Sequence, residues 1–271
     1  MKNIFLSVIL TVVLFTGCGK AKEVKVGYAS WISTSWEVNK FKDIAQEKLG
    51  DEYIVKLVAF ENDVYVAQAF QQKLVDVIFT EDGTIGGEAW ANLPFENGKI
   101  DEYNKNWQEF FKNYISIRIP TDVWYYSFYT PKKLGLKTID DLINYKDGFI
   151  VGCPAGYYDR GDNKNSFKCW AEYTGIKVKE VKELSETLML KAVDEGIITL
   201  GFSPEAMPLI YKNVSRVTGI VEQSYFQPQN YVIMCQPTVE EHIYKILFES
   251  LIPSTMDEFN EWYMETYGNN D

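Results

Sequence analysis

The middle third of the chain carries the side chains best suited to hold a small molecule. Three consecutive aromatic residues begin at Trp124 in an extended stretch, and a loop over 151–161 combines Tyr, Asp and Arg with glycine. In this loop, Tyr157, Tyr158 and Asp159 follow a segment with the pattern of a strand and precede a segment with that of a helix. Ligands of α/β proteins bind beyond the carboxyl ends of strands. We therefore predict that this stretch begins a second lobe, which closes over a small molecule, and that the loop lines the binding site.

Several other side chains leave a choice between the site and ordinary packing. Trp31 lies in a strand-to-helix turn, which favours a pocket over the core of the first sheet. The aromatic residues from Trp124 alternate across a strand, so at least one of them faces the core. Arg160 either pairs with a carboxylate or phosphate of the ligand or is a solvated surface charge. Asn230, near the point where the chain returns between lobes, is a further polar contact in this interpretation.

The sequence contains no pattern of a catalytic or metal centre. It has no Gly-x-Ser-x-Gly elbow, no Walker motif and no dinucleotide-binding glycine motif. The single histidine, His242, and the scattered cysteines do not form a histidine-rich or CxxC metal site. Glu81 and Asp82 are acids, but glycosidase chemistry needs two separated carboxylates in a sugar-sized groove. We therefore expect a binding protein without catalytic residues, metal or cofactor.

The composition is that of an acidic globular protein. The 271 residues include 27 basic and 38 acidic side chains, which give a net charge of −11, and 46% are hydrophobic. This apolar content suffices for one or two domains with a sizeable core. The negative charge argues against nucleic acid as a partner, and we expect a monomer.

The N-terminus has the pattern of an export signal. A basic tip over 1–3 precedes an apolar run over 4–15 that is too short to span a bilayer comfortably. The following Phe15-Thr16-Gly17-Cys18 resembles a bacterial lipobox, with Phe15 where leucine is usual. Cleavage before Cys18 and acylation of this residue would anchor the protein outside the cytoplasmic membrane, with no spanning helix after residue 18.

Three cysteines remain once Cys18 is lipidated: Cys153, Cys169 and Cys235. An odd number excludes complete pairing. A disulfide between Cys153 and Cys169 suits an exported protein, and three buried thiols are equally compatible with the sequence.

Strands and helices alternate after a short tether, which predicts a parallel sheet with right-handed crossovers. The strands are 24–28, 54–60 and 75–79, and the helices are 36–50 and 64–74. Gly50 ends the first helix, and Asn62 or Asp63 caps the second. The loops beyond the carboxyl ends of the three strands, where a ligand is expected, are 29–34, 61–63 and 80–83.

The same alternation resumes in the second half of the chain. A loop over 83–98 is expected before it, and 138–142 is predicted to be a helical turn capped by Thr138. The predicted strands are 148–152, 197–202 and 231–235, and the predicted helices are 166–174, 185–195, 239–251 and 256–267. Because 231–235 returns to the first lobe, we predict an α/β fold of two lobes, each a mostly parallel sheet flanked by helices. The expected division is a signal peptide over 1–18, a tether over 19–23, a first lobe over 24–117 with 220–271, and a second lobe over 118–219. A hinge is expected near 115–121 and 214–230.

Six segments are similar, in the same order, to the family of ABC-importer substrate-binding proteins that capture glycine betaine, proline betaine and choline. They are VKVGYASW at 24–31, 64–77 with VYVAQAF, 137–142 with KTIDDL, 150–156 with IVGCPAG, MLKAV at 189–193, and GFSP at 201–204. The resemblance implies a type II periplasmic-binding-protein fold and a quaternary ammonium group held in an aromatic cage. A trimethylammonium group gains roughly 2 kcal/mol or more over a desolvated aromatic face.

The chain departs from this family at two cage positions. Trp31 matches a tryptophan near the ligand, after the first strand. Asp82, with Glu81 beside it, lies where the family has a second tryptophan, and Phe202 replaces the tryptophan of Gly-Trp-x-Pro. A cap on a turn at Gly83 is an equally compatible role for Asp82. A carboxylate in this wall repels the carboxylate of a betaine and attracts a cation that lacks one. Choline-like and other cationic amines are therefore favoured over zwitterions.

The resemblance implies an extracytoplasmic receptor that delivers a small solute to a membrane permease. One alternative is the same fold binding another solute, such as an amino acid, and a less expected one is an exported hydrolase. A structural lipoprotein would not need two α/β lobes with aromatic residues at the strand ends.

Overall fold

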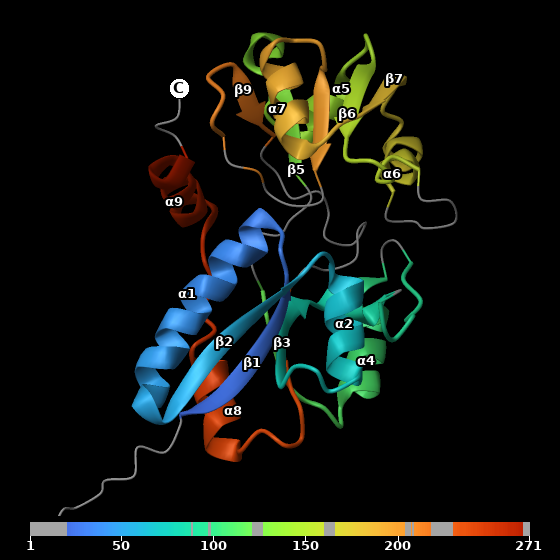
Figure 1. Cartoon of the computed structure of the whole chain (residues 1–271). Helices are drawn as coiled ribbons and strands as arrows, with labels where there is room; N and C mark the ends of the chain where they lie inside the picture. The colour runs from blue at the N-terminus through green and yellow to red at the C-terminus, as the bar shows by residue number, and fades with distance from the viewer. Residues whose placement is uncertain are drawn as a thin grey trace, which may run out of the picture.

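The computed structural model describes residues 21–87, 89–96, 99–120, 127–159, 166–203, 207, 209–217 and 230–267. These residues form two five-stranded sheets, sheet A and sheet B, each with helices on its faces (Figure 1). Sheet A, the sheet of the first lobe, takes strands from both ends of the described chain, and sheet B takes strands from its middle. The predicted α/β architecture with two lobes is confirmed.

Sheet A has the strand order β2-β1-β3-β10-β4. Its strands are β1 (Lys22–Ala29), β2 (Tyr53–Phe60), β3 (Val77–Glu81), β4 (Ile115–Ile119) and β10 (Tyr231–Cys235). β1 runs parallel to β2 and β3, whereas β10 runs antiparallel to β3 and β4. The predicted return of 231–235 to the first lobe is thus confirmed, and this strand lies between β3 and β4.

Helices cover both faces of sheet A (Figure 1). On one face lie α1 (Ile32–Leu49), which a short 3₁₀ turn η1 (Gly50–Glu52) follows, α8 (Glu241–Glu249) and α9 (Met256–Tyr267). On the other face lie α2 (Asp63–Gln71), α3 (Asp82–Gly86) and α4 (Ile100–Phe111). Successive strand residues alternate between the two cores, with Phe79 in the first and Ile78 in the second, because side chains of a strand point to opposite faces in turn.

Sheet B has the strand order β7-β6-β8-β5-β9. Its strands are β5 (Ser127–Pro131), β6 (Phe149–Cys153), β7 (Val178–Glu183), β8 (Leu200–Ser203) and β9 (Val214–Arg216). β6 is parallel to β7 and β8, and β5 is antiparallel to β8 and β9. A 3₁₀ turn, η2 (Lys132–Leu134), follows β5, and the helices of this lobe are α5 (Ile139–Asn144), α6 (Phe167–Thr174) and α7 (Glu186–Asp194).

Short-range signals in the sequence place several of these element ends. Asn62 caps α2 by accepting a hydrogen bond from the backbone of Tyr65, and Thr138 forms a capping box with Asp141 at the start of α5. Gly50 follows α1 with a φ of 66°, a conformation that glycine adopts without a steric penalty. These three predictions are confirmed. The expected loop over 83–98 is partly wrong, because the chain forms the short helix α3 immediately after β3.

Among the described residues, no helix has the length and apolar character needed to cross a membrane. The same part of the chain contains no cluster of His, Cys, Asp and Glu that could hold a metal ion.

Candidate functional site

The carboxyl ends of β1, β2, β3 and β4 meet at one edge of sheet A. Tyr231 pairs with Glu81 on one side and with Ile119 on the other. Residues just beyond this row, including Asp82 after β3 and Asn230 before β10, therefore lie at the same edge. Ligands of parallel sheets bind at such an edge, so the side chains found here form the candidate site.

Asp82 lies at the centre of a buried polar network at this edge. Its side chain is 0% exposed. Its Oδ1 accepts a hydrogen bond of 2.9 Å from the Asn230 backbone, and its Oδ2 accepts one of 2.7 Å from the Asn230 amide. Arg118 Nε donates to the same Oδ2. Burial raises the pKa of the Asp82 carboxyl, and the Arg118 guanidinium opposes that rise.

Neighbouring side chains hold Arg118 in place. The Nη2 of Arg118 donates to Asn104 Oδ1 at 2.6 Å, and the guanidinium lies 5.1 Å from the centre of the Trp107 ring. The indole of Trp107 and the hydroxyl of Tyr103 both donate to the backbone oxygen of Asp82, at 3.3 and 3.2 Å. Asp82 and Asn230 thus join β3, β4 and β10, and in this structure no Asp82 side-chain atom is available to a solute.

Trp31 and Asp63 form a second, more accessible cluster at the same edge. Trp31 is 39% exposed, and its indole nitrogen donates to Asp63 Oδ2 at 3.1 Å. Thr80 donates to Asp63 Oδ1 at 2.8 Å. Burial raises the pKa of Asp63, and the hydrogen bonds from Thr80 and Trp31 oppose the rise. The cluster combines an accessible aromatic ring with a carboxylate.

Asp63 was expected only as a possible helix cap, and its contact with Trp31 was not anticipated. The signal that could have identified it is its place in the loop 61–63, directly beyond β2. The two partners are 32 positions apart in the chain, and only the parallel pairing of β1 with β2 brings their loops together.

The predicted contacts of the second lobe have different placements. Phe202 is 0% exposed and packs against Phe128 and Phe167, with ring centres 5.4 and 5.3 Å away. This makes Phe202 a core residue of the lobe rather than an accessible wall. Trp124 lies outside the described residues, as does Arg160.

The loop after β6 remains close to the edge of sheet B. Tyr157 and Tyr158 are half-buried and pack on the core of the lobe. Their backbone oxygens accept from Phe167 and Lys168, which ties the loop to the start of α6. Asp159 is exposed and pairs with Lys168 at 2.7 Å.

Glu186 and Ser203 form a polar pair in the second lobe that the sequence did not indicate. Glu186 begins α7 and Ser203 ends β8. The Ser203 hydroxyl donates to Glu186 Oε1 at 2.7 Å, and burial raises the pKa of this carboxyl. The second lobe therefore has a carboxylate of its own near the end of a central strand.

All three cysteines of the described chain are free thiols. Cys153 and Cys235 are buried and Cys169 is partly exposed. The sequence left open either a Cys153–Cys169 disulfide or three free thiols. The structure has the free thiols and no Cys153–Cys169 disulfide.

Comparison with solved structures identifies other proteins with this fold. The chain matches a glycine betaine/carnitine/choline ABC transporter structure with a TM-score of 0.73 and 12% identity, over 93% of each chain. It matches apo YehZ from Escherichia coli with a TM-score of 0.67 and 12% identity, over 93% of this chain and 94% of that one. A substrate-binding domain assigned to a molybdenum ABC transporter of Clostridium difficile gives a TM-score of 0.54 and 12% identity, over 89% and 97%.

No family model matches the chain, and no curated protein matches it in sequence. At 12% identity, the structural similarities establish the type II periplasmic-binding-protein fold, as predicted, and leave the ligand open. Two of these structures are named for ABC transporters of different solutes, glycine betaine, carnitine or choline in one case and molybdenum in the other.

Proposed function

We propose that this chain is an extracytoplasmic solute receptor that captures a small cationic amine between its two lobes and delivers it to an ABC importer permease. The fold supports the receptor role. The observation that carries the choice of ligand is the accessible Trp31 ring beside the Asp63 carboxylate.

Both members of this cluster attract a cation. An aromatic face contributes roughly 0.5–1 kcal/mol at an exposed site and 2 or more once the cation is desolvated. The carboxylate adds direct attraction, and its two hydrogen bonds from Thr80 and Trp31 favour its charged form. Asp63 therefore takes the role that the sequence suggested for Asp82, whose own charge is balanced by Arg118.

The same charges select among amines. A betaine would bring its carboxylate towards an edge that already holds Asp63 and Glu81, and like charges at short range are unfavourable. A cation without a carboxylate, such as choline, meets no such repulsion. We therefore place choline-like amines ahead of zwitterions.

Capture follows from a shift between open and closed forms. Contacts made by both lobes exist only when the lobes are closed, so the ligand stabilises closure by the free energy of those contacts. In the second lobe, Tyr157, Tyr158 and Asp159 remain the proposed partners, with Glu186 as a further acid. The closed form would then present both lobes to the permease, while lipid at Cys18 keeps the monomeric receptor at the membrane.

Calorimetric titration of the chain from Gly19 onward with choline and glycine betaine tests the proposal. Choline should bind more tightly, and Trp31→Ala should weaken it by about 30-fold, since about 2 kcal/mol of cation–π energy is lost. Trp31→Phe should have a smaller effect because a ring remains. Asp63→Asn should weaken choline about tenfold.

Matched controls separate the site from general surface effects. Tyr173→Ala removes an exposed ring on α6, and Asp43→Asn removes an exposed acid on α1; neither should change the affinity. If another solute binds and no quaternary amine does, the receptor role stands and the cationic ligand is wrong. Turnover of any substrate would contradict the receptor role itself.

A further inference from the structure

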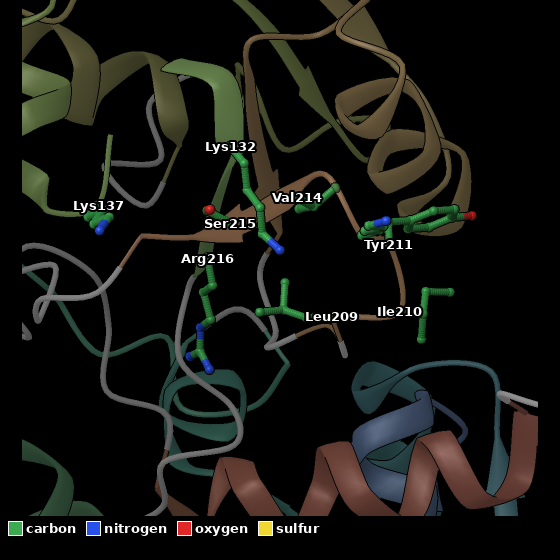
Figure 2. A pocket seen from close by; sticks show the side chains of 9 residues that line it. Lys132, Lys137, Leu209, Ile210, Tyr211, Val214, Ser215 and Arg216 are labelled. Atoms are coloured by element: carbon green, nitrogen blue, oxygen red, sulfur yellow. The ribbon is translucent and has the colours of Figure 1, made fainter. Parts of the chain in front are cut away.

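A pocket on the second lobe, which shares no residue with the proposed amine site, gathers basic side chains at the outer edge of sheet B. It encloses about 450 Å³. Lys132, Lys212 and Arg216 supply charge, and Leu209, Ile210 and Val214 supply an apolar wall. Figure 2 shows the side chains of Lys132, which follows β5, and Arg216, on β9, extending in the same direction in this view.

The fold builds the walls of this pocket from distant parts of the chain. Antiparallel pairing of β5 with β9 sets Pro131 opposite Val214, and the Lys132 backbone donates to Asn213 O at 2.7 Å. The Asn213 backbone in turn donates to Asp194 Oδ1 at 2.9 Å. These bonds hold the segment 209–213 against the end of β5, so the cations from both sides share one space.

None of the described residues that line the pocket is acidic. A fourth cation, Lys137, also lines the pocket, but its backbone bonds to the Asp141 carboxylate and its charge acts on the same acid. Within the part of the chain that the structure describes, Lys132, Lys212 and Arg216 form no ion pair with a carboxylate. Three positive charges that have no carboxylate partner among the described residues therefore line one pocket.

The chain as a whole has a net charge of −11, which would repel an anion at long range. At physiological ionic strength, however, charges act over a screening length of about 8 Å. Acids elsewhere on the surface are screened, whereas cations that touch the bound group are not. The pocket can thus hold an anion although the protein is acidic.

We propose that this pocket binds the phosphate of a phosphate ester, with the organic part of the molecule against Leu209, Ile210 and Val214. Several cations around one group suit a phosphate, which carries more charge and more acceptor oxygens than a carboxylate. The mixed lining suits an organic phosphate better than the inorganic ion. The site is independent of the amine site, because it attracts the opposite charge and uses no residue of the Trp31 and Asp63 cluster.

Titration calorimetry of the chain from Gly19 onward with phenyl phosphate tests this site, with inorganic phosphate as the weaker reference. Arg216→Gln should weaken phenyl phosphate by roughly tenfold or more, as hydrogen bonds to charged groups are among the strongest, and Lys132→Gln should do so to a similar extent. Lys177→Gln removes an exposed lysine beside β7, at the opposite edge of sheet B, and should have no effect. Trp31→Ala should also have none.

A second experiment distinguishes a lipid headgroup from a soluble phosphate ester. It measures flotation of the protein with vesicles of phosphatidylglycerol or of phosphatidylcholine. Binding to phosphatidylglycerol that Arg216→Gln and Lys132→Gln abolish would identify a lipid headgroup as the source, and binding of phenyl phosphate alone would identify a soluble ester. Both outcomes support the site. Absence of binding in both arms, or equal weakening by Lys177→Gln, would overturn it. Melting curves of each variant show that it is folded, and the two pocket variants test the site separately.

Discussion

Replacement of Asp82 by asparagine should destabilise the first lobe strongly, because it removes the charge from the buried network that joins β3, β4 and β10. The wild-type carboxylate accepts two hydrogen bonds from Asn230 and one from Arg118. Asparagine has the same shape but only one acceptor oxygen. Its amide would therefore point a donor at Arg118 or at the Asn230 amide, which are donors themselves.

The loss of stability in Asp82→Asn depends on how well Arg118 is accommodated without its charged partner. Removal of one partner from a buried ion pair lowers stability by about 3–5 kcal/mol. Arg118 is 18% exposed and keeps its contacts with Asn104 and Trp107, so it can recover some hydration, and we expect the lower end. About 3 kcal/mol corresponds to a fall of roughly 6–12 °C in Tm for a domain of this size.

Urea unfolding of wild type and Asp82→Asn, with the midpoint and slope compared, measures this difference. Asp159→Asn breaks the exposed pair with Lys168 and should change stability by less than about 1 kcal/mol. Addition of Arg118→Met to Asp82→Asn should restore part of the loss, because the unpaired guanidinium is gone. If Asp82→Asn leaves stability unchanged and abolishes choline binding, the structural role is refuted and direct ligand contact by Asp82 is favoured.

Two further predictions concern titratable groups in the core. Burial raises the pKa of Glu37 in the folded chain from 4.5 to about 7, so its contribution to stability is complete below pH 4.5 and is lost as the pH rises through 7. Urea unfolding across this window should show a loss of roughly 3 kcal/mol that is absent in Glu37→Gln; parallel profiles would contradict this. Burial also raises the pKa of the Cys153 and Cys235 thiols to about 12, so a thiol reagent at mildly alkaline pH should modify at most Cys169 in the folded chain. Three thiols should react after unfolding without reductant, whereas a single one would reveal a Cys153–Cys169 disulfide.

Local signals predicted most of the elements of this fold. The strand pattern before residue 80 corresponds to β1, β2 and β3, and the caps at Asn62 and Thr138 lie where they were expected. Such signals act over a few residues, through side-chain alternation and hydrogen bonds to the nearest backbone. They also indicate which loops follow the strands, which is why Trp31 was recognised as a candidate from the sequence.

The role of each side chain at those loops depends on contacts that the sequence does not display. Asp82 meets Asn230 from 148 positions away, and this contact converts an expected ligand-binding acid into a buried structural one. Phe202 has the same explanation: its match to a cage tryptophan of the family suggested a wall of the site, but packing against Phe128 and Phe167 encloses it.

Residue types and their spacing thus determined the secondary structure, the α/β class and the edge of the sheet where binding is expected. Tertiary structure alone decided which acid at that edge is balanced by arginine, which acid lies beside the exposed Trp31 ring, and that Lys132 and Arg216 line one pocket. The physical reason is that strand register sets these distances, and register depends on pairing between segments far apart in the chain.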